Sequence, residues 1–131
     1  MSIQPTLNAT IYSTLGGTIT NAGTAVYFLQ APDNAVLPYI VWDYVNEGEE
    51  NTNPHRGKDC VLFIRAYAST PSAAGVIDGQ IDTALHEKTL TITGWTNIQT
   101  RRENGMSMVE TDSAGRKTYM CGADYRIRSA K

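Results

Sequence analysis

The first hydrophobic pattern of the chain has a period of four, which is the spacing of residues on one face of a helix. Its members are Ile3, Leu7, Ile11 and Leu15. Pro5 fits a first helical turn, because its missing N–H would have no helical partner there. The glycine pair at 16–17 can end the helix. This pattern predicts a short N-terminal helix.

Three segments downstream have the composition of strands. Residues 25–30 are β-branched and aromatic, between Gly23 and Pro32, and residues 59–69 alternate between two faces. The segment 38–47 is largely apolar on both of its faces. We therefore expect this strand to be covered on both sides, by a helix on one and by another subunit on the other.

Four residues of the segment 38–47 are interpreted as specifying the fold rather than forming a ligand cage. They are Pro38, Tyr39, Trp42 and Tyr44. A proline at the entry stops the incoming loop from pairing, and aromatic rings suit a strand that packs on two faces. The polar connection 46–58 that follows is long, and connections of this length are more often functional than idle.

A second helix is predicted from Thr70, which can cap it with Pro71 at the first position. Apolar residues then recur at helical spacing, and Asp78 falls with the polar residues on the other side. The apolar set is Ala73, Val76, Ile77, Ile81, Ala84 and Leu85. Residues 90–103 resemble a strand interrupted near Gly94, and residues 106–129 a hairpin that turns at 112–115.

The order of elements is thus helix, three strands, helix, three strands (α-β-β-β-α-β-β-β). Short connections between strands predict a mostly antiparallel sheet, with both helices packed on one face. A chain of 131 residues fits one α+β domain, 1–131, and its 41% apolar content against 18% charged residues is typical of a globular protein.

Charge is distributed unevenly along the chain, although the formal net charge is only −2. Residues 1–57 contain five acidic side chains and one basic one, whereas residues 101–131 contain seven basic and four acidic ones. Both segments could be ordinary solvated faces. Alternatively, they are complementary patches that meet between neighbouring copies in an oligomer.

Candidate catalytic and metal-binding groups are few. His55 and His86 lack partners at metal-ligand spacing, so we expect no metal and no cofactor. Cys60 and Cys121 lie in apolar strand patterns, which is typical of buried free thiols. No base is assigned to either thiol, and the acidic side chains of the connection 46–58 are expected to be solvated. We therefore predict that the protein is not an enzyme.

The N-terminal segment lacks the basic start and apolar run of a signal peptide, and no segment has the roughly 20 apolar residues of a membrane helix. We therefore expect synthesis in a cytoplasm and no membrane partner. The basic C-terminal section contains interleaved aromatics, as nucleic-acid platforms do. However, Tyr119 and Tyr125 share a strand face with Cys121 and Ile127, which favours a core role for them.

Segment order and two local patterns resemble the tail-completion, or tail-terminator, proteins of long-tailed bacteriophages and related prophage or gene-transfer particles. The patterns are APDNAVLPYIVW at 31–42 and ETDSAGRKTY at 110–119, before a final YRI at 125–127. The likeness covers nearly the whole chain. It lies in the order and character of segments rather than in a catalytic signature.

The resemblance implies a structural virion protein that forms a ring, typically a hexamer, on the head-proximal end of the tail tube. Such a ring ends tube polymerisation and allows head-tail joining. Its implied partners are further copies of the chain, the major tail tube protein and the head-side connector or stopper protein. The genome DNA would pass through the channel without specific binding.

Contact roles with neighbouring subunits or the tube are assigned, as hypotheses, to eight charged residues. They are Glu47, Glu49, Glu50, Arg56, Arg101, Arg102, Arg116 and Lys117. Two alternatives remain open: a head-tail connector, neck or head-completion protein, and, in another class, a small cytoplasmic nucleic-acid-binding domain. A backbone binder should lose DNA steeply as salt rises, whereas a terminator should have little affinity for it.

Overall fold

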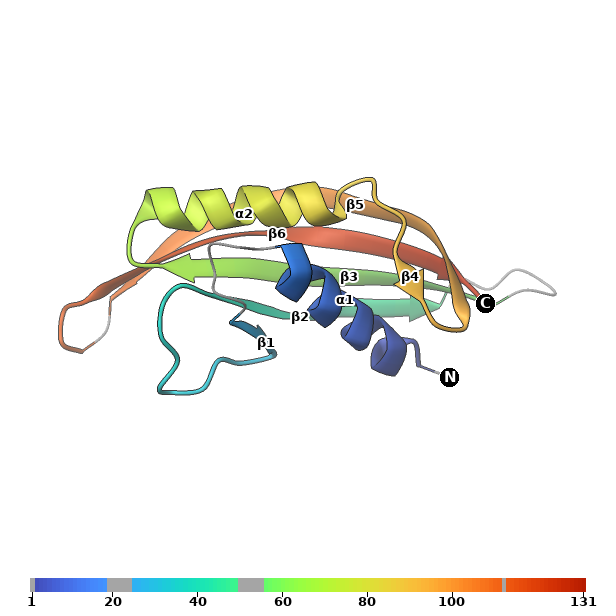
Figure 1. Cartoon of the computed structure of the whole chain (residues 1–131), viewed down its shortest axis with the longest axis horizontal. Coiled ribbons are helices and arrows are strands. Elements are labelled where there is room, and N and C mark those ends of the chain that lie inside the picture. Colours follow the sequence, from blue (N-terminus) through green and yellow to red (C-terminus); the bar gives the residue numbers. More distant parts are fainter. Residues whose placement is uncertain (1, 19–24, 50–55, 112) are drawn as a thin grey trace.

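The helices and strands follow one another in the order that the sequence predicts (Figure 1). This computed structural model describes residues 2–18, 25–49, 56–111 and 113–131. The helices are α1 (Gln4–Thr18) and α2 (Pro71–Leu85). The strands are β1 (Val26–Phe28), β2 (Tyr39–Glu49), β3 (Gly57–Ala68), β4 (Thr91–Ile92), β5 (Trp95–Thr111) and β6 (Lys117–Ala130). Glu50, His55 and Asp112 lie outside the described residues.

The strands form one sheet in the order β1-β2-β3-β6-β5-β4. Every neighbouring pair is antiparallel except β1 and β2, which run parallel and place Val26 beside Ile40. Both helices lie on the same face of this sheet (Figure 1). The predicted α+β class, mostly antiparallel sheet and one-sided helix packing are confirmed.

The core lies between the helices and the sheet. The four apolar residues that recur with a period of four are fully buried; Ile3 directly precedes α1 and the other three lie within it. Ile81 and Leu85 of α2 are also fully buried. They pack with sheet residues such as Trp42 and Ile64. Thr70 caps α2 as expected, with its hydroxyl accepting a 3.1 Å bond from Ala73 N. Val76 is an exception to the predicted apolar face, since it is 47% exposed.

The four residues interpreted as fold-specifying contribute to different faces of the sheet. Trp42 is buried on the helix side, 4.5 Å from the ring of Phe28. Tyr44 is half-buried on the same side, and its hydroxyl donates a 2.6 Å bond to Asn8 Oδ1 of α1. Burial raises the pKa of Tyr44 well above its ordinary value. Tyr39 and Pro38 are half-buried, and Tyr39 faces away from the helices.

Gly94 separates β4 from β5 through a turn with φ of +83°, a conformation that favours glycine. Downstream of this turn, β5 is one continuous strand to Thr111 rather than the two segments that the sequence analysis separated. A register shift between Arg102 and Gly105 absorbs the irregularity within it. The β5–β6 hairpin is confirmed, with Gly115 in its turn at φ +82°.

Candidate functional site

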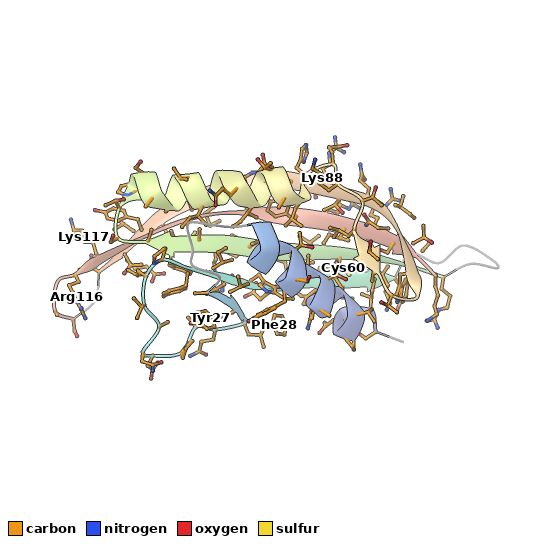
Figure 2. The ribbon with its side chains drawn as sticks, in the orientation of Figure 1. Tyr27, Phe28, Cys60, Lys88, Arg116 and Lys117 are labelled. Carbon is orange, nitrogen blue, oxygen red and sulfur yellow. The ribbon has the colours of Figure 1, made fainter. Side chains whose placement is uncertain are left out.

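The predicted contact residues are distributed along the whole length of the sheet. Glu47 and Glu49 lie where β2 ends, close to the start of β3. Arg116 and Lys117 lie at the tip of the β5–β6 hairpin, at the opposite end of the molecule (Figures 1 and 2). Glu49 and the two cations of the hairpin tip are therefore far apart within one copy.

Glu47 reaches the start of α1 because β2 contains a bulge between Tyr44 and Asn46. The bulge shifts the strand by one residue, so Glu47 lies opposite Cys60 on the helix side. Its carboxylate accepts bonds from Ser2 Oγ at 3.0 Å, Ile3 N at 3.3 Å and Gln4 Nε2 at 3.1 Å. A negative charge at a helix N-terminus is favourable, so Glu47 stabilises α1 within its own subunit.

Glu49 lies opposite Lys58 and accepts a hydrogen bond from its ammonium group. This bond holds the pKa of Glu49 below its usual range. Lys58 is buried and also lies 3.7 Å from Glu47 Oε1. Arg56 is exposed, and its carbonyl accepts a bond from Lys131 N at the C-terminus. The acidic end thus contains one buried cation between two carboxylates.

Arg102 belongs to a polar clamp between β5, α2 and β6. Its guanidinium donates to Asp78 Oδ1 at 3.1 Å and Oδ2 at 2.7 Å, and to the Tyr125 hydroxyl at 3.1 Å. Its backbone N donates to His86 Nδ1 at 3.0 Å. The hydrogen bonds to Asp78 raise the pKa of Arg102 further above its ordinary value.

Asp78 is the member of this clamp that sequence reasoning missed, because it was grouped with the polar side of α2. In the structure Asp78 is only 7% exposed. The available signal was its position directly after Ile77, at the margin of the apolar face. Its partner Arg102 is 24 residues away in sequence, which no local pattern connects.

Arg101 is exposed and lies opposite Arg126 of β6, on the face of the sheet away from the helices. On that face Arg126 donates to Asp59 from two nitrogens. This pairing holds the pKa of Asp59 below its usual range. Arg116 and Lys117 are exposed at the hairpin tip.

Neither of the described helices lies over the second face of the sheet (Figure 1). Aromatic rings gather on this face. Tyr39 lies 5.2 Å from Tyr67 and 5.9 Å from Tyr27, measured between ring centroids. Burial, and then the neighbouring Tyr67, raise the pKa of Tyr39. Beside them Arg65 covers the Phe63 ring and pairs with Asp43. This face combines apolar area with satisfied charges.

The cysteines and histidines do not form a reactive group. Cys60 is a buried free thiol, and burial raises its pKa to about 12. Cys121 is a free thiol that is only half-buried. The prediction of a buried thiol is therefore confirmed for Cys60 alone. His86 follows the end of α2, and its Nδ1 accepts a backbone bond. Within the described ranges, no three His, Cys, Asp or Glu side chains are grouped as a metal site requires. None of the described helices is long and apolar enough to cross a membrane.

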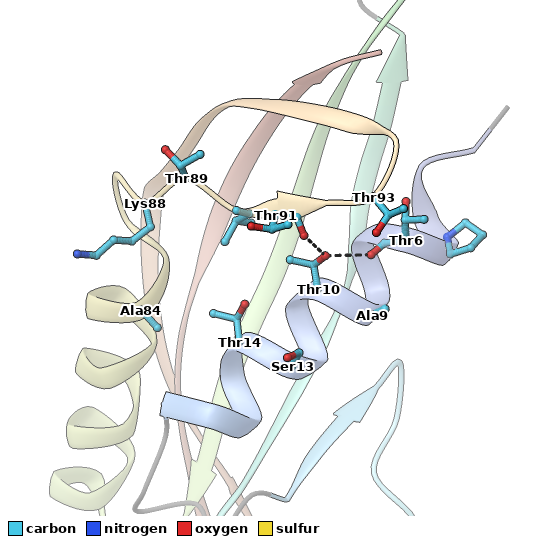
Figure 3. Close-up of a pocket in the computed structure, with 12 residues that line it drawn as sticks. Thr6, Ala9, Thr10, Ser13, Thr14, Ala84, Lys88, Thr89, Thr91 and Thr93 are labelled. Atoms are coloured by element: carbon cyan, nitrogen blue, oxygen red, sulfur yellow. Dashed lines mark hydrogen bonds between the residues drawn. The ribbon is translucent and has the colours of Figure 1, made fainter.

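A hollow of about 560 Å³ lies between α1 and the segment that contains β4. Figure 3 shows the residues that line it. Most of its lining is threonine, serine and alanine, and Lys88 is the one charged side chain among the described lining residues. The Thr10 hydroxyl lies 2.8 Å from Thr91 O and 3.1 Å from Thr6 O, both backbone acceptors within the fold. The hollow offers hydroxyl groups but no pairing of acid and base.

Comparisons with known proteins agree with this geometry. A solved chain described as "Virion of native gene transfer agent (GTA) particle" has the same fold, with a TM-score of 0.80 at 16% identity. The match covers 99% of this chain and 98% of that one. The comparison with curated proteins gave no match. Residues 11–128 match the family model described as "Tail completion protein gp17". The chain therefore belongs to the gp17 family of tail completion proteins.

Proposed function

We propose that copies of this chain form a ring that caps the head-proximal end of a phage-type tail tube. The family resemblance implies that the ring is a hexamer. The family makes the chain a structural tail-completion protein of a virion rather than an enzyme. In the proposed role the ring ends tube polymerisation and presents a surface to the head-side connector. Its neighbours are further copies, the tail tube protein and the connector.

The observation that carries the proposal is the separation of charge along the sheet. A ring requires heterologous contacts, in which one patch of a subunit meets a different patch of the next. The exposed carboxylate of Glu49 and the exposed cations of Arg116 and Lys117 lie at opposite ends of the sheet (Figures 1 and 2). Such an arrangement favours a head-to-tail order of copies.

The aromatic second face supports the same proposal. Natural monomers rarely expose large contiguous apolar patches, and such patches commonly mark interfaces. Tyr39 and Tyr67 form the centre of the proposed contact with a neighbouring subunit or the tube, and the Asp43–Arg65 pair borders it. The expectation that another subunit covers this face therefore stays part of the proposal.

Electron microscopy of particles made when the gene carries an early stop codon tests the proposed function. We expect filled heads beside unattached tails of uncontrolled length. Normal-length free tails beside heads that leak or lack a neck would instead assign the chain to the connector. Normal infectious particles would contradict any role in tail completion.

Charge reversal tests the acidic end separately. Replacing Glu49 and Glu50 by lysine should lower the yield of joined particles, because these groups are proposed to meet a basic patch. The matched control is Glu87→Lys, an exposed acid in the segment after α2. Unchanged assembly with the Glu49 and Glu50 reversal would exclude this contact while leaving the capping role open.

A further inference from the structure

The outer edge of β5 is covered along one half of the strand only. β4 pairs with its first residues, Glu87 N donates to Thr100 O at 2.8 Å, and Arg102 N donates to His86. From 103 to 111 every side chain is exposed, and no described segment pairs with the strand on the side away from β6. We call residues 103–111 the free edge. Figure 1 shows the tip of this hairpin extending past the start of α2.

Between Glu103 and Glu110 the free edge has few of the devices that protect edge strands in natural proteins. Its sequence, ENGMSMVET, contains neither lysine nor proline, and its register shift lies at the start, before Gly105. Met106, Met108 and Val109 are each about half exposed, at 51%, 48% and 53%. Exposed apolar side chains beside a row of unpaired backbone N–H and C=O groups make this edge a site for another strand.

We propose that the free edges of two copies pair antiparallel, about a two-fold axis at Ser107. In this register Met106 lies opposite the partner's Met108, and Gly105 lies opposite the partner's Val109. Glu103 meets Thr111 and Asn104 meets Glu110, so no like charges lie directly opposite each other.

The side-chain directions suit this register. Met108 lies opposite Met120 of β6 and Met106 lies opposite Gly122, so both methionines are on the face away from the helices. Pairing two copies would place four methionines side by side on one continuous sheet. Flexible thioether side chains pack well in such irregular contacts.

The outer edge of β1, on the opposite side of the sheet, is a poorer partner for the free edge. β1 has three residues, which leaves most of the free edge without a partner. α2 packs against β3 and β6 more than against β5, so the helix leaves the outer side of β5 accessible. The free edge therefore fits a second copy of itself best.

A two-fold pair is closed, because both copies use the same patch, and it cannot grow into a ring. The pair is thus the form of the free subunit, in which the edge is protected from aggregation until the chain meets the tail. This consequence rests on the proposed function, whereas the pairing itself does not.

Sedimentation velocity of the purified chain tests the pairing over roughly 1–200 μM, the range of weak protein contacts. The dimer fraction should rise with concentration. The double variant Met106→Lys, Met108→Lys should remain monomeric throughout, because it opposes like charges across the pair. The control Val76→Lys, on α2, should dimerise like the parent. A parent that stays monomeric, or a control that dissociates equally, would overturn the proposal.

Disulfide trapping tests the register. In a Cys121→Ser background, an equimolar mixture of Met106→Cys and Met108→Cys chains should cross-link several-fold more than either alone. Directly opposite residues lie about 4.5–5.5 Å apart between Cα atoms, which is within disulfide range. Position 106 of one copy and position 106 of the other lie on a diagonal, about 7–8 Å apart. Equal or absent cross-linking would overturn the register. Neither experiment involves particles, so its failure is distinct from a failure of the proposed function.

Discussion

The two halves of the β5–β6 ladder have the same strand pairing but different surroundings. In β5, Asn97 and Thr100 are buried and Arg102 is half-buried, whereas every residue from 103 to 111 is exposed. We call the first half, together with the part of β3 that pairs with it, the body, and α2 and the loop after it form a third layer over it. The second half, the arm, has only the start of α2 near it, at Pro71 and Ala74, and its side chains on β5 stay exposed. Backbone pairing alone continues a sheet, but burial of side chains requires that third layer.

Arg102 marks the boundary between the body and the arm. Its clamp with Asp78 and Tyr125 lies on the helix side, and the register shift follows directly. Because body residues are committed to the fold, substitutions there should reduce stability. Substitutions in the arm should change association instead. The predictions below test this division.

The largest expected effect is cavity formation in the body. Leu62→Ala removes a fully buried side chain and should lower the free energy of unfolding by about 3 kcal/mol. Met108→Ala in the arm should change it by less than about 0.5 kcal/mol. Urea unfolding followed by circular dichroism measures both. Similar losses for the two variants would contradict the division into body and arm.

A smaller loss is expected at the boundary. Arg102→Ala leaves the Asp78 carboxylate buried without its ion-pair partner, so the free energy of unfolding should fall by about 2 kcal/mol. The matched control is Arg101→Ala, an adjacent exposed arginine, which should be neutral within about 0.5 kcal/mol. Chemical denaturation of both variants decides the point. An equal effect would mean that the clamp contributes nothing specific.

Acid should weaken the second face of the body by a modest amount. Arg126 lowers the pKa of Asp59 in the folded state, so this stability is present above the ordinary aspartate pKa of about 4 and is lost as pH falls below it. Because the Arg126 side chain is 42% exposed, the contribution is about 0.5 kcal/mol. The melting temperature should fall between pH 6 and pH 3, and this fall should be smaller in Arg126→Gln than in the parent. An equal fall in both proteins would exclude the Asp59–Arg126 pair as its source.

Thiol labelling should distinguish buried and accessible positions without changing stability. Burial raises the pKa of Cys60 to about 12, so it should resist iodoacetamide at pH 8 until urea unfolds the chain. Cys121, which is half-buried opposite Ser107 in the middle of the arm, should be modified first. Mass spectrometry of partly labelled protein gives the order. Earlier labelling of Cys60 would show that the body opens locally.

Periodicity predicted the elements whose packing is local. The period of four in α1, the capped start of α2 at Thr70 and the hairpin with Gly115 were all evident in the sequence. The parallel pairing of β1 with β2 was not, because it depends on where a loop returns. The bulge after Tyr44 was also missed, although it decides which face Glu47 occupies.

The candidate contact residues could be chosen from charge, but their partners could not. Glu47 binds the start of α1 more than 40 residues away, and Arg102 binds Asp78 within the same subunit. Both are engaged in the fold, while Glu49, Arg101 and Lys117 are exposed. The contact role of the whole set stays a prediction, and Glu50 lies outside the described residues.

Cryo-electron microscopy of the head–tail junction in intact particles tests the central claim most directly. The account predicts a ring of copies of this fold directly on the last ring of the tail tube, with the second face of the sheet covered by a neighbour. Its absence from that position, or its presence only in the neck or at the distal tip, would contradict the claim that this chain ends the tail.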